Sequence, residues 1–433
     1  GPLTGPLTNT LPRILVTRSS ADGSSGLAHL AVGNRQASCC TADKKPGASA
    51  AFRCKVEHVI DPSGIKNAKV AIIKKRMLWA AEYMATLISV RPIVDAVTFE
   101  EPAASGTYAV TVNRSVTNAD LLIIATARPY EFGGVAGYAK CLQQDQWGRC
   151  TVGQFNFCPE VIQEDTSTAP ETIEAERHTA LHELFHVLGV VKTEPGWFCN
   201  STLSSYVTQS TMYSSPAVPV ALVNTPRVLA IARQQFGCPT LQGVPLENLA
   251  IGVGSHWEAR VFGPEVMSYG ARSGQTYVSD ITLAWCDDSG HYVANYSAAG
   301  RLVVGSFNRA TRTNSFFASA RRQASEGEMG VTMRGPGYLT WGREAGCDFV
   351  TKAPSEWSDT LQKQYLCNTN KQSMCTPDNR VSAVCSLYDY SPGKNPVNPK
   401  SCYLSSSSNM CSSQCCGRGA FDAATKECAG SAK

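Results

Sequence analysis

The sequence predicts an α+β protein that contains a mixed sheet, packed helices and a disulfide-rich C-terminal region. Short β-branched apolar runs at 14–17 and 119–126 predict strands, whereas residues 65–89 between them have the apolar spacing of a helix. Eight of the 18 cysteines lie after residue 353. We therefore expect strands and helices in one packed unit, followed by a region that disulfides stabilise.

The composition is that of a folded protein without nucleic-acid-binding or membrane-spanning character. Hydrophobic residues make up 43% and charged residues 17% of the 433 residues, which excludes wholesale disorder. The formal net charge of +4 is small, so we expect no nucleic-acid partner. Apolar runs such as 121–127 are far shorter than the roughly 18–20 residues of a membrane helix, and we expect no transmembrane segment. The first residues lack the features of a signal peptide, which predicts a mature or trimmed chain.

The cysteine content indicates a secretory route. Eighteen cysteines are far more than a cytosolic protein normally keeps, and disulfides are the simplest interpretation. Zinc ribbons are the alternative, but no two Cys-x-x-Cys elements stand at zinc-finger separation. Glycosylation sequons at Asn113, Asn200 and Asn295 agree with passage through the secretory pathway. We expect a disulfide-bonded glycoprotein that is extracellular or at the cell surface.

One predicted helix carries residues that bind metals. It begins near Pro170 and ends at Gly189, and it contains the motif HExxH as His182, Glu183 and His186. Residues four apart lie on one helix face, so the two imidazoles can chelate one Zn²⁺ at about 2.0–2.1 Å. Glu183 can then take a proton from the water on the metal. The alternative is an amphipathic helix with incidental histidines, but three ionisable groups among apolar neighbours are costly unless something binds them.

A hydrolytic zinc site needs a third protein ligand and an open fourth position. The longer motif HExxHxxGxxH would place that ligand at position 192, but the chain has Lys192 there, so the ligand comes from elsewhere. His178 lies on the same helical stripe, about 12 Å along the axis from His186, and we expect only a supporting role for it. His256 lies in the glycine-containing segment GVGSHWEAR, and Met267 follows it.

The segments HELFHVLG, GSHWEAR and EVM together resemble the leishmanolysin family, metzincin zinc surface proteases in which a long insertion separates the helix glycine from the third histidine. The similarity extends to ARQQFGCPTL before that histidine and to LTWGREAGCDFVT after the methionine. It covers roughly residues 65–390. The resemblance implies that His182, His186 and His256 are zinc ligands. It also implies that Glu183 is the catalytic base and that Met267 forms the Met-turn beneath the metal.

The segment that follows Met267 also resembles the turn of astacins and serralysins. In those proteins a tyrosine two residues after the methionine lies near the zinc and can hydrogen-bond the oxyanion. Tyr269 is therefore a candidate stabiliser of the transition state. The alternative is an aromatic side chain packed in the core under the turn.

We expect three regions along the chain. Residues 1–190 form an N-terminal catalytic subdomain with a mixed twisted sheet and the HExxH helix. Residues 191–352 form a central subdomain that supplies the third histidine and the Met-turn and includes an insertion at 301–339. Residues 353–433 form the cysteine-rich domain.

The sequence thus predicts a secreted or cell-surface zinc endopeptidase that binds protein or peptide substrates as an added strand. The alternative from another class is a catalytically idle adhesion or assembly protein with the same scaffold, which would not require Glu183. A purely structural zinc would require a fourth protein ligand, and no such residue stands near these motifs. Many family members carry a glycolipid anchor, but no apolar tail follows the small residues 429–432 here.

Overall fold

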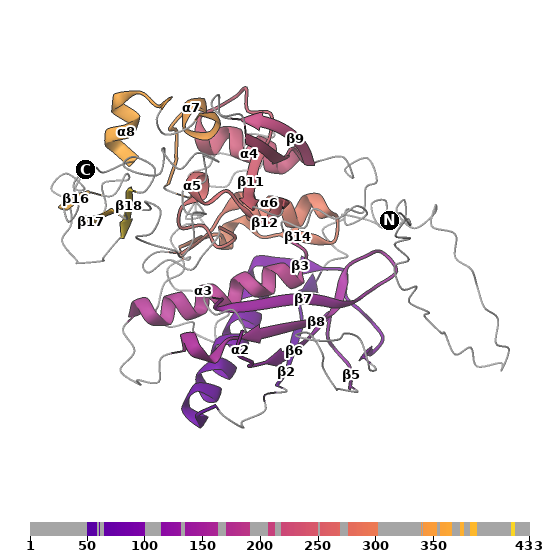
Figure 1. Cartoon of the computed structure of the whole chain (residues 1–433). Coiled ribbons are helices and arrows are strands. Elements are labelled where there is room, and N and C mark those ends of the chain that lie inside the picture. Colours follow the sequence, from indigo (N-terminus) through magenta and orange to yellow (C-terminus); the bar gives the residue numbers. More distant parts are fainter. Residues whose placement is uncertain are drawn as a thin grey trace, which may run out of the picture.

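The first half of the fold is built on a four-stranded mixed sheet with the strand order β2-β6-β8-β7 (Figure 1). Three strands are parallel neighbours, namely β2 (Cys54–His58), β6 (Leu121–Thr126) and β8 (Cys150–Phe157). The fourth, β7 (Gly137–Gln144), runs antiparallel to β8 at one edge. The computed structural model describes residues 50–58, 60, 65–99, 114–130, 135–162, 170–190, 207–212, 218–249, 252–268, 276–301, 339, 341–352, 356–365, 373–375, 382–387 and 417–420.

Two long helices pack together beside this sheet: α2 (Asn67–Leu87) and α3 (Pro170–Val187). Helix α2 confirms the helix predicted at 65–89, and α3 is the predicted HExxH helix. The approach of α3 to the sheet is very close at Gly153 of β8, where an added Cβ would lie 2.3 Å from Val187. Only glycine therefore permits this packing distance.

Short strands cover other parts of this half. β4 (Val97–Phe99) and β5 (Arg114–Val116) form an antiparallel pair. Val97 and Phe99 pack with Leu122 and Val152 in a small core of their own, separate from the main one. The predicted strand at 119–126 is confirmed as β6, while the run at 14–17 lies outside the described residues.

The second half contains an antiparallel sheet with the strand order β12-β11-β10-β9. Its strands are β9 (Val207–Met212), β10 (Val218–Val223), β11 (Val244–Leu249) and β12 (Gly252–Trp257). Its helices are α4 (Pro226–Phe236), α5 (Ala259–Phe262) and α6 (Asp280–Ser289), and α4 packs on α6. The strands β13 (Tyr277–Val278) and β15 (Gly300–Arg301) form an antiparallel pair after the Met267 segment, and α6 lies between these two strands in sequence.

The two halves share one continuous core. β14 (Tyr292–Ala294) returns to the first half and pairs with β3 (Ile88–Val90), which also pairs with β1 (Ala50–Ala51). The main buried cluster includes residues of both halves, from Ile73 to Trp285 and Phe349. This α+β architecture confirms the predicted fold class, while the boundaries at 190 and 352 stay predictions.

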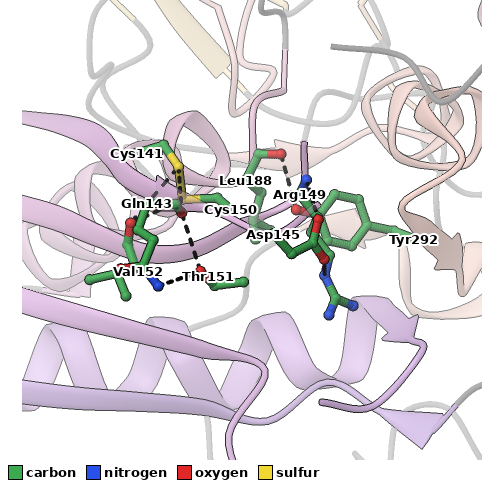
Figure 2. The surroundings of a disulfide bond; sticks show 9 residues. All are labelled: Cys141, Gln143, Asp145, Arg149, Cys150, Thr151, Val152, Leu188 and Tyr292. Atoms are coloured by element: carbon green, nitrogen blue, oxygen red, sulfur yellow. Dashed lines mark hydrogen bonds and ion pairs between the residues drawn. A yellow bond between two sulfur atoms is a disulfide. The ribbon is translucent and has the colours of Figure 1, made fainter. Parts of the chain in front are cut away.

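Two disulfides form among the described residues, which confirms the interpretation of the cysteines. Cys141–Cys150 links the two strands of the β7–β8 hairpin (Figure 2). Cys238–Cys347 links the end of α4 to the start of α7 (Cys347–Thr351). Three described cysteines, Cys54, Cys158 and Cys286, form no disulfide, so an even cysteine count did not imply complete pairing.

The segment just before α7 packs against α4. Glu344 N donates to the Gln235 carbonyl at 2.9 Å, and Gly346 N donates to the Phe236 carbonyl at 2.7 Å. Beyond α7 lie α8 (Asp359–Tyr365) and the three strands β16 (Ser373–Cys375), β17 (Ser382–Leu387) and β18 (Gly417–Ala420). The predicted insertion at 301–339 falls outside the described residues, apart from its two end positions.

We predict that the double substitution Cys238→Ala/Cys347→Ala lowers the free energy of unfolding by about 2–4 kcal/mol, because this disulfide closes a long loop. The two cysteines are 109 residues apart. Denaturant unfolding of the oxidised proteins measures the loss. Cys54→Ala is the control, because it removes a thiol that forms no disulfide, and an equal loss in this control would contradict the prediction.

Candidate metal centre

Helix α3 places His182 and His186 one turn apart near its C-terminal end. Neighbouring apolar side chains anchor this stretch, since Leu181 and Phe185 are fully buried. The helix stops at Gly189, which has a φ of 81°. Val190 N donates to the Phe185 carbonyl and Gly189 N to the His186 carbonyl, the two bonds of a Schellman cap. The glycine predicted to end the helix therefore does so, immediately after the motif.

Two side chains of the second half donate to carbonyls at this helix end. Trp285 Nε1 of α6 donates to the Gly189 carbonyl at 3.1 Å, and the Tyr292 hydroxyl of β14 donates to the Leu188 carbonyl at 3.2 Å. Figure 2 shows the second of these bonds beside the β7–β8 hairpin. The last turn of the histidine helix is thus fixed by the half of the chain that carries His256.

The structure brings three histidines together. His256 is the penultimate residue of β12, whose pairing with β11 is irregular between Leu246 and Asn248. Its Nε2 atom lies 3.0 Å from His182 Nε2 and 3.1 Å from His186 Nε2, and the latter two atoms are 3.1 Å apart. Within the part of the chain that the structure describes, these three histidines form a group that is arranged to hold a metal ion.

The hydrogen bonds of His182 determine its tautomer. Its Nδ1 lies 2.6 Å from the Val266 carbonyl, which can only accept, so Nδ1 carries the proton and Nε2 presents a lone pair. Burial lowers the pKa of His182 to about 4, and burial together with the neighbouring imidazoles lowers the pKa of His186 and His256 well below the usual value. The three rings are therefore neutral near pH 7.

This arrangement fits a cation. Three neutral imidazoles whose lone pairs converge repel one another unless a positive ion lies between them. Tetrahedral ligands at about 2.0–2.1 Å from Zn²⁺ are roughly 3.3 Å from one another, close to the observed separations. Three nitrogen ligands with a further position open to water or substrate are the donor set of a hydrolytic zinc site.

Glu183 lies on the same helix turn and is buried. Burial raises the pKa of its carboxyl to about 8. A cation at the three imidazoles would favour the charged carboxylate and lower this pKa. An added Cβ on Gly137, the first residue of β7, would lie 3.1 Å from Glu183 Cγ, so the start of this edge strand lies against the side chain.

Met267 lies in a turn that contacts the site through its backbone. Its side chain is fully buried, and its carbonyl accepts a hydrogen bond of 3.0 Å from Trp257 N, next to His256. The preceding residue, Val266, supplies the carbonyl that orients His182. Glu265 accepts a hydrogen bond from Met267 N at 2.5 Å. Glu265 lies in the EVM segment, but sequence reasoning assigned it no role, because its partners become neighbours only on folding.

His178 does not join the three histidines. It is buried one turn before His182, with its ring stacked at 5.7 Å from that of His182. Its Nδ1 hydrogen-bonds with Thr276 Oγ1 at 3.2 Å, and Thr276 N donates to Glu174 at 2.7 Å. His178 and Glu174 thus connect α3 to the chain just before β13, which agrees with the supporting role expected of His178.

The other predicted residues lie elsewhere or outside the described chain. Tyr269, Asn113 and Asn200 are outside the described residues. Asn295 is exposed at the end of β14, where its Nδ2 donates to the Thr86 carbonyl and its Oδ1 accepts from Ser297 Oγ, the hydroxyl of its own sequon.

Comparison with known proteins identifies the family. The family model of the leishmanolysin peptidases matches residues 36–313, more than half of the chain. The leishmanolysin-like peptidase of Drosophila pseudoobscura pseudoobscura is 28% identical over 65% of this chain and 42% of its own length. The ciliated left-right organizer metallopeptidase of Mus musculus is 32% identical over 44% of this chain and 28% of its own length. Leishmanolysin of Leishmania tropica is 25% identical over 65% of this chain and 35% of its own length. The chain thus spans less than half the length of these relatives.

We predict that His256→Ala abolishes tight zinc binding, whereas His178→Ala retains it. Only His256 has a nitrogen that converges with those of His182 and His186. Metal content after dialysis of each purified variant measures the difference. Equal zinc retention by the two variants would show that the third ligand is another residue.

Proposed function

The chain belongs to the leishmanolysin family of metallopeptidases, and on that premise we propose that it is a zinc-dependent endopeptidase. The observation that carries the proposal is the convergence of the Nε2 atoms of His182, His186 and His256 beside the buried carboxyl of Glu183. We assign the three histidines as zinc ligands and Glu183 as the general base. Met267 is assigned as the Met-turn residue.

The proposed chemistry needs one group to accept and return a proton. When bound, zinc lowers the pKa of a water molecule and polarises the carbonyl of the peptide bond. Glu183 accepts a proton from that water and then donates it to the departing amine. Burial raises the pKa of Glu183 to about 8 without a cation, and a bound cation would lower it, so the carboxyl would be ionised and able to accept that proton. His182 keeps its lone pair on Nε2 because Val266 binds the proton on Nδ1.

The edge strand β7 is the proposed place of the substrate. It pairs with β8 on one side, and no strand of the described chain pairs with its other side. Its first residue, Gly137, lies against Glu183, so a peptide added along β7 would bring its backbone to the base. Extended peptides bind exposed sheet edges in this way through main-chain hydrogen bonds. Protein or peptide substrates are therefore the partners proposed.

The alternative, a catalytically idle adhesion or assembly protein with the same scaffold, is less well supported. A protein that only binds or assembles needs no buried carboxyl beside three convergent imidazoles, since burial of this group is costly. A structural zinc would need a fourth protein ligand, and the described residues offer three.

We also propose an extracellular or cell-surface location. The two disulfides agree with an oxidising compartment. The sequon at Asn295 is exposed, as glycosylated asparagines are. Among the described helices, none has the length and apolar character needed to cross a membrane.

We predict that Glu183→Gln lowers peptide cleavage by at least about 10²–10⁴-fold while zinc content stays at the wild-type level, because the amide keeps the size of the side chain but cannot act as a base. Digestion of a peptide library with and without a chelator, followed by sequencing of the products, measures activity and reveals the cleavage sites. Glu176→Gln is the matched control on the same helix, since Glu176 is buried against Arg76 instead. Near-normal cleavage by Glu183→Gln would refute the role of the base.

Tyr269→Phe separates the two interpretations of this residue. A hydroxyl that stabilises the oxyanion predicts a fall in kcat of about 10²–10³-fold with little change in KM or melting temperature. The substitution keeps the ring and removes only the hydroxyl. Steady-state kinetics and thermal unfolding of the zinc-loaded variant provide the measurement. An unchanged kcat would make Tyr269 a packing residue.

A further inference from the structure

One buried carboxylate lies between the Met267 turn and helix α6. Glu265 is fully buried, and both oxygens of its carboxylate accept hydrogen bonds. Oε2 accepts from Met267 N at 2.5 Å. Oε1 accepts from Ser279 N at 3.2 Å, Ser279 Oγ at 2.9 Å and Thr282 Oγ1 at 2.5 Å. Glu265 therefore joins the turn to the first turn of α6, which Ser279 caps.

Through the Met267 turn, this carboxylate is connected to His182. Glu265 fixes Met267 N, and the residue between them is Val266, whose carbonyl binds His182 Nδ1 at 2.6 Å. Val266 N in turn donates to the Tyr277 carbonyl at 2.7 Å. The Val266 carbonyl and Met267 N belong to the same peptide group. The hydrogen bond from Met267 N to Glu265 therefore helps to set the direction of this carbonyl, and so the ring orientation of His182.

The helix side leads to His256. Thr282 Oγ1, which donates to Glu265, accepts a hydrogen bond of 2.9 Å from the indole of Trp257. Trp257 follows His256 in the chain, and its backbone N donates to the Met267 carbonyl at 3.0 Å. One carboxylate is therefore connected to the neighbours of two histidines from different elements, α3 and β12.

We propose that Glu265 is a positioning residue of the metal centre, which sets the separation of the His182 and His256 rings before a metal binds. This inference rests on the proposed function, since it concerns the same three histidines. Groups that orient metal ligands typically change metal affinity by about 10–100-fold when they are removed.

An amide cannot replace this carboxylate. Four donors point at its two oxygens, and two of them, Met267 N and Ser279 N, are backbone groups that cannot accept. A glutamine would direct its NH₂ at a donor in either orientation, so one side of the connection would be lost while the size of the side chain is kept. Glu265→Gln is therefore a specific test.

The experiment measures zinc affinity by competition with a chromogenic chelator, using metal-free full-length protein, and the melting temperature of the same samples. We expect Glu265→Gln to bind zinc about 10–100-fold more weakly than the wild type. Asp120→Asn is the matched control. Asp120 is also a buried carboxylate that accepts two backbone bonds, from Arg53 N and Ile93 N, but it lies in the first half of the fold, where it pairs with Arg53. We expect this control to lose melting temperature without losing zinc affinity.

Thr282 provides a second test that does not change Glu265. Thr282→Val keeps the branched shape but removes the hydroxyl between Glu265 and Trp257, and we expect a smaller loss of zinc affinity in the same direction. Thr282→Ser restores the hydroxyl, and we expect wild-type affinity. If Glu265→Gln does not fold, equal zinc affinities of the Val and Ser variants would overturn the proposal.

Other outcomes separate this inference from the proposed function. Zinc affinity of Glu265→Gln within twofold of the wild type, or an equal loss in Asp120→Asn, would overturn the positioning role alone. A wild type that binds zinc and cleaves no peptide, with the affinity pattern as expected, would refute the peptidase and leave the positioning role standing. A wild type that binds no zinc would overturn both.

Discussion

The constraint on which this structure depends is the convergence of three imidazole Nε2 atoms around a common point, at separations that match the roughly 2.0–2.1 Å bonds of Zn²⁺ to histidine nitrogen. Helix geometry supplies two of them, because His182 and His186 are one turn apart. The third must come from another element, and it comes from β12 in the other half of the fold. Nitrogens that approach to 3.0–3.1 Å tolerate little relative movement of the two halves. The packing between the halves is therefore part of the site.

That packing is concentrated at the end of α3. The carbonyls of Gly189 and Leu188, just after the helix, accept hydrogen bonds from Trp285 and Tyr292, and β14 pairs with β3 of the first half. The Cys141–Cys150 disulfide lies in the hairpin beside this contact (Figure 2). Hydrogen bonds, strand pairing and a disulfide thus lie close together near the end of α3. They limit the movement of the helix that carries two of the proposed ligands.

The sequence predicted those features that have a local period and missed those that depend on tertiary contact. HExxH and Gly189 identified the helix and its end, since spacing and capping are local. His256 was assigned by resemblance alone, because no helical or strand period relates it to α3. The contacts of Glu265 and Gly137 were not predicted, since their partners lie on other elements. The pairing of cysteines was likewise unpredictable, and three described thiols remain free.

The proposed base and the proposed ligands form one electrostatic unit. Without a cation, burial favours the neutral form of Glu183 and raises its pKa to about 8, while burial keeps the imidazoles neutral as well. A carboxyl whose folded pKa is raised contributes stability below its unfolded pKa, and that contribution is lost as the pH increases through the folded value. A divalent ion at the imidazoles reverses this preference, because it favours the carboxylate. The same ion would therefore bind the three imidazoles and convert the buried carboxyl into a base. Both the imidazoles and the carboxyl of the metal-free fold thus favour a cation near neutral pH.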